Sequence, residues 1–202
     1  MTLVIKSKQI LRKIRKYYLQ KQNAKTPIRN RITIKIELYD QLDKTTLSAI
    51  DNIFKKVFNR TLSSDQEWHT PHLIAIAYLG NKIISIRYII KTSALFDSKP
   101  VIVGGTGGLL TLPSYRGFGI AKKTFKYVDN HLFNQLNVEC GLFICGEQLV
   151  HYYRKLGWYR SKSQLFYYKD NIRTELVEYC VMLKSKNNKY QPNIIEINGE
   201  LW

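Results

Sequence analysis

A short stretch of glycines and basic side chains, residues 116–123, has the residue types of an anion-binding loop. Arg116, Gly117 and Gly119 stand directly before or at the start of a segment with helical periodicity, and Lys122 adds positive charge. Glycines leave the backbone N–H groups at the start of a helix unshielded, and the helix dipole adds positive potential at the same place. The stretch therefore predicts a cradle for phosphate oxygens.

Two common phosphate-binding loops do not fit this spacing. A nucleoside-triphosphate loop of the form G-x-x-x-x-G-K-S/T that starts at Gly117 needs a second glycine where the chain has Lys122. A dinucleotide-binding loop built on Gly117 and Gly119 needs its third glycine at the same position. The remaining alternative to a binding loop is an ordinary glycine-containing turn between a strand and a helix.

The hydrophobic pattern around this loop predicts the elements that position it. Strands are expected over residues 32–38, 73–79, 83–90, 101–112, 141–145, 164–168 and 176–183, and helices over 45–59, 117–137 and 148–156. The turn at residues 80–82 predicts a hairpin, and the last two strands are expected to form a pair. This order is typical of a mixed α/β or α+β domain.

The strand expected over residues 101–112 contains glycines at 104, 105, 107 and 108. Glycines inside a strand often mark a bulge or a close approach of another backbone. A loop between two short strands is the alternative.

Two motifs in this arrangement resemble the GNAT acyltransferase superfamily. The segment from Arg116 to Ala121 is similar to the family's motif A, Q/R-x-x-G-x-G/A between a strand and a helix, at every fixed position. The segment from Val150 to Trp158 resembles the end of the family's next helix, F-Y-x-x-x-G-F/W. Together with the element order, the resemblance extends over residues 31–185.

The resemblance implies the GNAT fold, a mixed and mostly antiparallel central sheet of about seven strands flanked by helices. It also implies direct transfer of an acetyl group from acetyl-CoA to a primary amine, with no metal ion. The residues implied in binding the donor are Leu110, Thr111, Leu112, Arg116, Gly117, Phe118, Gly119, Ile120, Ala121 and Lys122. A longer acyl chain, or a protein lysine or amino terminus as acceptor, is the alternative within the family.

The same resemblance assigns the general acid to Tyr153, four residues before Gly157. Its hydroxyl would protonate the thiolate that leaves the donor. The neighbouring Tyr152 is expected to be a core aromatic residue.

The general base is not assigned by the resemblance. Relatives that modify aminoglycosides carry a Glu on the strand before motif A, where this chain has Gly107. A chain of water molecules could replace it, and the candidate side chains are Asp65, Glu67, His69, His72 and Glu147.

The tail, residues 186–202, carries another resemblance. Its last nine residues, from Ile194 to Trp202, look like the end of aminoglycoside 2'-N-acetyltransferases, which close with Gly, an acid, an apolar residue and Trp. In those enzymes the final carboxylate reaches the acceptor pocket. The resemblance implies that Trp202 and Glu200 contact a cationic, aminoglycoside-like amine, and a disordered tail is the alternative. Glu147, just beyond the strand expected over residues 141–145, is a further candidate for substrate binding.

Charge divides the chain of 202 residues into two parts. The formal net charge is +17, and residues 1–30 carry nine Lys or Arg and no acid. These residues are expected to form a basic amphipathic arm, helical up to Pro27, before a GNAT domain over residues 31–202. The arm would pack on the domain, act as a targeting segment, or bind nucleic acid or an acidic membrane, so a non-catalytic binding protein is the alternative function.

Composition sets the remaining expectations. Apolar residues make up 45% and aromatic residues 12%, which predicts a compact domain and excludes intrinsic disorder. Neither a membrane span nor a secretory signal is found, so the expected location is cytoplasmic. Cys140, Cys145 and Cys180 are expected to be reduced core thiols, because their spacing fits neither a redox pair nor a metal site. The oligomeric state stays open, with a homodimer as one option.

Overall fold

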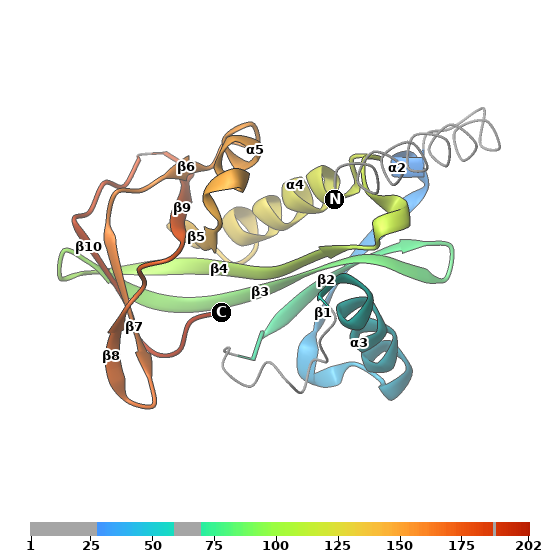
Figure 1. Cartoon of the computed structure of the whole chain (residues 1–202), viewed down its shortest axis with the longest axis horizontal. Coiled ribbons are helices and arrows are strands. Elements are labelled where there is room, and N and C mark those ends of the chain that lie inside the picture. Colours follow the sequence, from blue (N-terminus) through green and yellow to red (C-terminus); the bar gives the residue numbers. More distant parts are fainter. Residues whose placement is uncertain (1–27, 59–69, 188) are drawn as a thin grey trace, which may run out of the picture.

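The computed structural model describes residues 28–58, 70–187 and 189–202 (Figure 1). The predicted basic arm lies outside these ranges except for its last residues, which belong to the short helix α2 (Ile28–Arg31). None of the helices in the described part of the chain is long and apolar enough to cross a membrane.

The described residues form one mixed sheet of ten strands. All neighbouring strands run antiparallel except the pairs β4–β5 and β7–β10. The strands are β1 (Ile32–Leu38), β2 (Leu73–Leu79), β3 (Lys82–Phe96), β4 (Lys99–Thr111), β5 (Cys140–Cys145), β6 (Tyr159–Arg160), β7 (Gln164–Lys169), β8 (Ile172–Glu175), β9 (Cys180–Ser185) and β10 (Ile194–Ile197). The predicted mixed, mostly antiparallel sheet is confirmed, and the C-terminal region adds strands that the sequence pattern did not predict.

Helices cover both faces of this sheet. They are α3 (Lys44–Phe58), α4 (Ile120–Asn134) and α5 (Val150–Arg154), with the short 3-10 turns η1 (Tyr39–Gln41), η3 (Pro113–Tyr115) and η4 (Glu147–Leu149). Figure 1 shows α4 and α5 over one face and α3 over the other. Helix α4 begins at Ile120 and not at Gly117, because Gly117 and Gly119 have φ angles of +87° and +76° that an α-helix does not allow.

The long hairpin of β3 and β4 organises the sheet. Along one edge β3 pairs with β4, and along its other edge it pairs first with β2 and then, near its end, with β10. The turn between β3 and β4 consists of Asp97 and Ser98, whose φ angles of 47° and 66° match the two-residue turns that join twisted antiparallel strands.

Strand β4 separates from β5 halfway along its length. The two strands pair for three residues only, and the last pair is Gly105 with Leu142. Strand β4 then continues to Thr111 without a register partner on β5. Its register against β3 shifts beside Gly108, which has a φ of +54°, so the glycines form a bulge within one strand. The alternative of a loop between two short strands is therefore wrong.

The predicted pairing of the last two strands is also wrong. Strand β7 pairs with β8 and β10, whereas β9 pairs with β5 and β6. The apolar run over residues 176–183 is not one strand, because Val177 and Tyr179 are 79% and 47% exposed. Only the part from Cys180 onward is buried, and this part enters the sheet.

The three cysteines are free and buried, as predicted. Cys145 and Cys180 are nonetheless direct cross-strand neighbours on β5 and β9. Burial raises the pKa of the Cys145 thiol to about 11, so this thiol stays protonated near neutral pH.

One ion pair between a buried carboxylate and a partly buried lysine joins α4 to β9. Asp129 Oδ2 accepts hydrogen bonds from Lys184 Nζ at 2.8 Å and from Trp158 Nε1 at 3.3 Å. We predict that Lys184→Met lowers the free energy of unfolding by about 2 kcal/mol, because it leaves a buried carboxylate without its cation. Urea denaturation measures this loss.

The exposed pair of Lys55 and Asp51, also 2.8 Å apart, provides the matched control. Lys55→Met should change the free energy of unfolding by less than about 0.5 kcal/mol. Equal losses for the two variants would contradict the structural role of the pair of Asp129 and Lys184.

Candidate active site

The loop before α4 holds a row of backbone N–H groups that make no backbone hydrogen bond. No carbonyl of the described residues accepts from the N–H groups of residues 117–122, and the first such bond joins the Lys123 N–H to the Gly119 carbonyl at 3.0 Å. Gly117 and Gly119 are exposed, and a Cβ added at Gly117 would meet no atom within 4 Å. At its two exposed glycines the loop thus has the unshielded backbone that a bound phosphate requires at the start of a helix.

Four of the residues implied in donor binding are buried. Leu110, Leu112 and Ile120 are at most 7% exposed, and Thr111, at 9%, has its Oγ1 2.9 Å from Ser85 Oγ, so none of these side chains faces an open donor site. Leu109, which the sequence analysis did not single out, is only partly buried and packs against the aromatic cluster around Tyr153. Leu109 is therefore a better side-chain candidate on the free edge of β4.

The other donor-binding candidates differ in what their side chains do. Arg116 Nε donates to the Thr111 carbonyl at 3.1 Å and so ties the loop to the end of β4. Phe118 and Ala121 are half-buried, whereas the Lys122 side chain is exposed beside the row of amides. Arg116 and Lys122 are thus the exposed cations of this group, and Lys122 lies in the first turn of α4.

Tyr153 lies in an aromatic cluster on the α4 side of the sheet. Its ring centroid is 4.6 Å from that of Phe143 and 5.2 Å from that of Phe125, and the residue is 9% exposed. Burial raises the pKa of Tyr153 to about 12, although the positive charge of Arg87 opposes the shift. The hydroxyl therefore stays protonated near neutral pH. Tyr152, expected in the core, is 38% exposed, so that expectation is wrong.

Arg87 on β3 is a charged residue of this cluster that the sequence analysis missed. Its side chain is 1% exposed, its Nε donates to Thr106 Oγ1 on β4, and its guanidinium carbon lies 3.4 Å from the ring centroid of Phe125. One signal could have revealed it: Arg87 stands in the middle of an otherwise apolar strand, where a charge is seldom found.

The tail ends on the opposite face of β4. A Cβ added at Gly105 would collide with the Trp202 indole, and one added at Gly107 would lie 3.3 Å from the Trp202 carbonyl carbon and 3.5 Å from its oxygen. The glycines thus allow the close approach that their position in the strand predicted. Trp202 is 8% exposed, so the alternative of a disordered tail is wrong.

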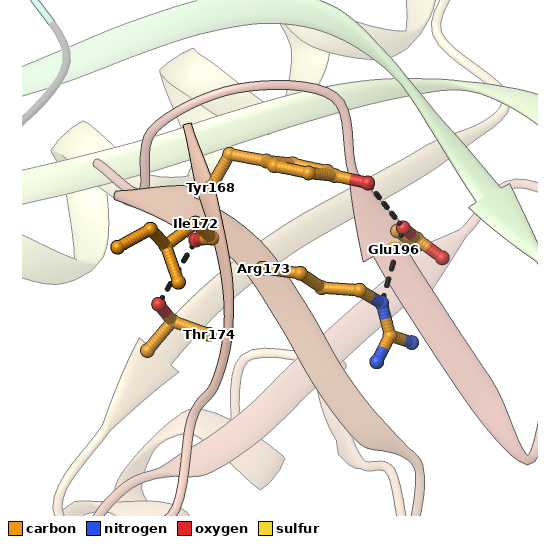
Figure 2. Close-up of polar contacts among 5 residues, drawn as sticks. All are labelled: Tyr168, Ile172, Arg173, Thr174 and Glu196. Carbon is orange, nitrogen blue, oxygen red and sulfur yellow. Dashed lines mark hydrogen bonds and ion pairs between the residues drawn. The ribbon is translucent and has the colours of Figure 1, made fainter. Parts of the chain in front are cut away.

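Strand β10 holds the tail in this position. It pairs with the end of β3 and with β7, and its outward-facing Glu196 binds two side chains of the β7–β8 hairpin. The Tyr168 hydroxyl donates to Glu196 Oε1 at 2.9 Å, and Arg173 Nε donates to the same oxygen at 3.2 Å (Figure 2). These bonds lower the pKa of Glu196, so the carboxylate stays charged and keeps both contacts near neutral pH.

The three residues implied in acceptor binding do not form one group. Trp202 faces Gly107, the position where relatives carry a Glu, whereas Glu200 is exposed on the tail. Glu147 pairs with Arg160 at 2.8 Å and accepts from Cys180 Sγ at 3.0 Å, beside β9. The Glu147 carboxylate is therefore already engaged away from the tail.

The remaining candidates for a general base gain no support. His72 is exposed, and its Nδ1 accepts from the Lys91 N–H at 3.4 Å. Asp65, Glu67 and His69 lie outside the described residues. Within the described ranges, no three His, Cys, Asp or Glu side chains are grouped so that they could hold a metal ion.

Solved structures of known proteins share this architecture. Escherichia coli ElaA is 13% identical and matches over 76% of this chain and 99% of its own, with a TM-score of 0.57. An acyl-CoA N-acyltransferase from Pseudomonas aeruginosa is 10% identical over 76% of this chain and 99% of its own, with a TM-score of 0.55. The GNAT family N-acetyltransferase YhbS from Escherichia coli, solved in complex with CoA, is 14% identical over 83% of this chain and 90% of its own, with a TM-score of 0.55.

The chain therefore has the GNAT fold, the fold that its two motifs indicate. At these low identities the likeness establishes the fold alone. The sequence matches no protein-family model, and a search of curated proteins found no match.

We predict that Gly105→Ala destabilises the protein by about 2 kcal/mol, because the added methyl group collides with the Trp202 indole. Gly107→Ala, where the nearest atom is 3.3 Å from the added Cβ, should cost clearly less. Chemical denaturation of both variants, and of each combined with Trp202→Ala, gives the coupling energy.

In that cycle the penalty of Gly105→Ala should largely vanish once the indole is removed. If the penalty is the same with and without Trp202, the contact between the tail and β4 does not explain why glycine stands at position 105.

Proposed function

We propose that this protein is a GNAT-type acyltransferase that moves an acetyl group from acetyl-CoA directly to a primary amine. The observation that carries the proposal is the row of unbonded N–H groups over residues 117–122, which continues from the edge of β4 that β5 leaves free. This combination offers hydrogen-bond donors for a diphosphate and a strand edge for an amide-containing arm.

The residues present fit a coenzyme A donor. Gly117 leaves open space above the loop, and Lys122 adds a positive charge next to the amides. Acetyl-CoA supplies an acyl group activated as a thioester. The protein's part is to anchor the phosphates on the loop, to align the donor on the edge of β4, and to exclude water from the reacting end.

Donor and acceptor would approach β4 from opposite faces. Successive residues of a strand point to opposite sides, so Gly104 faces Leu132 of α4 while Gly105 faces Trp202 of the tail. The cluster of Tyr153 lies on the α4 side, and the tail covers the other side. In this proposal donor and acceptor meet where the pairing of β4 with β5 ends, which suits direct attack without a covalent enzyme intermediate.

Tyr153 acts in this proposal as the group that stabilises the leaving thiolate. A phenol with a pKa of about 12 is a weak acid for a thiolate, because an ordinary thiol has a pKa of about 8.5. A hydrogen bond from the hydroxyl to the sulfur therefore contributes more than complete proton transfer does.

The acceptor in this proposal is a cationic amine that binds near Trp202, with an aminoglycoside-like molecule as the first candidate. The main-chain oxygen of Trp202, close to Gly107, and the exposed Glu200 offer acceptors for amine protons. Release of free thiol in the presence of aminoglycosides, polyamines, amino acids and peptides would distinguish a small amine from a protein acceptor, and longer acyl-CoA donors belong in the same screen.

We predict that the protein binds acetyl-CoA saturably and that Gly119→Trp abolishes this binding, because the indole would cover the row of amides. Isothermal titration calorimetry measures both. Gly80→Trp is the matched control, since Gly80 has a similar positive φ of +58° in the β2–β3 turn, and no atom lies within 4 Å of a Cβ added there.

The control variant should bind acetyl-CoA as the wild type does. If both variants bind equally well, the loop before α4 is not the phosphate site. Salt-sensitive binding to DNA or anionic vesicles in place of acetyl-CoA would instead favour a non-catalytic binding protein.

Tyr153→Phe should lower kcat by about 100-fold and leave acetyl-CoA affinity nearly unchanged, because the hydroxyl acts on the leaving group. Tyr152→Phe is the control and should keep most of the turnover. Since Tyr153 has a pKa of about 12, the wild-type rate should not fall through loss of its proton between roughly pH 7 and 9. Steady-state thiol release measures these rates, and an unchanged rate in Tyr153→Phe would remove Tyr153 from this role.

A further inference from the structure

Arg87 is a buried cation with an unused hydrogen-bond donor. The side chain is 1% exposed, and one of its terminal nitrogens, Nη1, is buried without any hydrogen-bond partner among the described residues. Burying a charged group without a partner is costly, so a protein that keeps one gains something elsewhere. Among the described residues, its Nε donates a hydrogen bond to Thr106 Oγ1.

Aromatic rings surround the guanidinium. Its central carbon lies 3.4 Å from the ring centroid of Phe125, and 5.9 Å from those of Phe143 and Trp158. Cation–π attraction offsets part of the desolvation cost, but it leaves the positive charge in place. The site is thus a dry environment in which a charge acts more strongly than in water.

The ionisable groups around Arg87 do not neutralise it. Those whose charges act on it within the described ranges are Asp129 of α4 and the phenols of Tyr152 and Tyr153 on α5. Asp129 is already bound to Lys184 of β9 at 2.8 Å. Two cations therefore share one carboxylate, and the two tyrosines are neutral, which leaves one positive charge uncompensated.

Burial lowers the pKa of Arg87 to about 10, so the side chain remains protonated at neutral pH. Its position decides what this charge can act on. Thr106, the partner of Arg87, directly follows Gly105, the last residue of β4 that pairs with β5. Arg87 thus lies at the strand separation and within electrostatic reach of Tyr153.

We infer that Arg87 supplies the positive charge that stabilises the thiolate as it leaves the acyl donor, alongside the Tyr153 hydroxyl. The inference rests on the proposed function. In that reaction the amine nitrogen forms a bond to the acyl carbon, the carbon–sulfur bond breaks, and its electron pair leaves on sulfur. The proton lost by the nitrogen passes to solvent or finally to the sulfur, so the net products are an amide and the free thiol.

A stabilised thiolate can be measured without turnover. We predict that coenzyme A, the thiol product, binds with a lowered thiol pKa, whereas desulfo-coenzyme A, which lacks the sulfur, reports all other contacts. Titration calorimetry of both ligands between roughly pH 6.5 and 9 gives the ratio of their affinities. If the free thiol titrates like a cysteine thiol, at about 8.5, and the bound thiol about one unit lower, the preference for coenzyme A rises roughly sevenfold over this range.

The protein groups around the site should stay in one protonation state over this range. Arg87, Cys145 and Tyr153 have pKa values of about 10, 11 and 12, and Cys180, beside Cys145, has its thiol pKa raised by its bond to Glu147. A rise in the preference with pH therefore reports the ligand thiol. Arg87→Met, which removes the charge at similar length, should make the ratio independent of pH, and Arg87→Lys should restore part of the rise.

The binding measurements separate failure of the Arg87 inference from failure of the proposed function. If Arg87 has a purely structural role, Arg87→Met lowers the stability of the protein and weakens the binding of both ligands equally. This result overturns the inference. A pH-independent ratio in the wild type overturns it as well, even if neither variant folds. Failure of the wild type to bind either ligand overturns the proposed function and the role of Arg87 with it, whereas equal binding of both ligands overturns the role of Arg87 alone.

Discussion

The separation of β4 from β5 is the constraint on which the rest of the structure depends. The two parallel strands pair for three residues only, so along the remaining edge of β4 no strand from the described part of the chain covers the backbone groups. The bulge at Gly108 re-aims this free part of β4, and the strand then leads through η3 into the loop before α4. One strand therefore supplies an open edge and, at its end, a row of open amides.

Charge is distributed around this separation in an unusual way for a protein interior. Asp129 and Lys184 form a pair that also fixes the Trp158 indole. Among the described residues, Arg87 has aromatic rings and a threonine hydroxyl around it but no carboxylate of its own. A region built only for stability gains little from such a charge, since apolar residues of similar volume often serve as well. The uncompensated positive charge of Arg87 has a use if the reaction beside it produces an anion, as the release of a thiolate does.

The tail gives the other face of β4 its shape. Strand β10 extends the sheet beyond β3, and Glu196 fastens it to the β7–β8 hairpin through Tyr168 and Arg173 (Figure 2). The following residues turn back so that Trp202 covers the glycines of β4. The absence of side chains at Gly105 and Gly107 is what permits this contact, so strand and tail depend on each other.

Local sequence patterns were enough to predict the type of most helices and strands and to mark the loop before α4 as a candidate binding loop. Hydrophobic periodicity predicted β1, β2, α3 and β5 to within a residue or two, and the glycines before Ile120 indicated exposed amides at a helix start. These are local properties, because a side-chain pattern over a few turns or a positive φ does not depend on distant parts of the chain.

Which segments lie next to one another became known from the three-dimensional arrangement alone. Periodicity did not predict that β7 and β9 lie apart, that Cys145 faces Cys180, or that Arg87 is buried beside Tyr153. It also left open whether the tail would be ordered against Gly105 and Gly107. Contacts between residues far apart in sequence depend on how strands pair and on which face each side chain occupies, and a one-residue change of register would alter all of them.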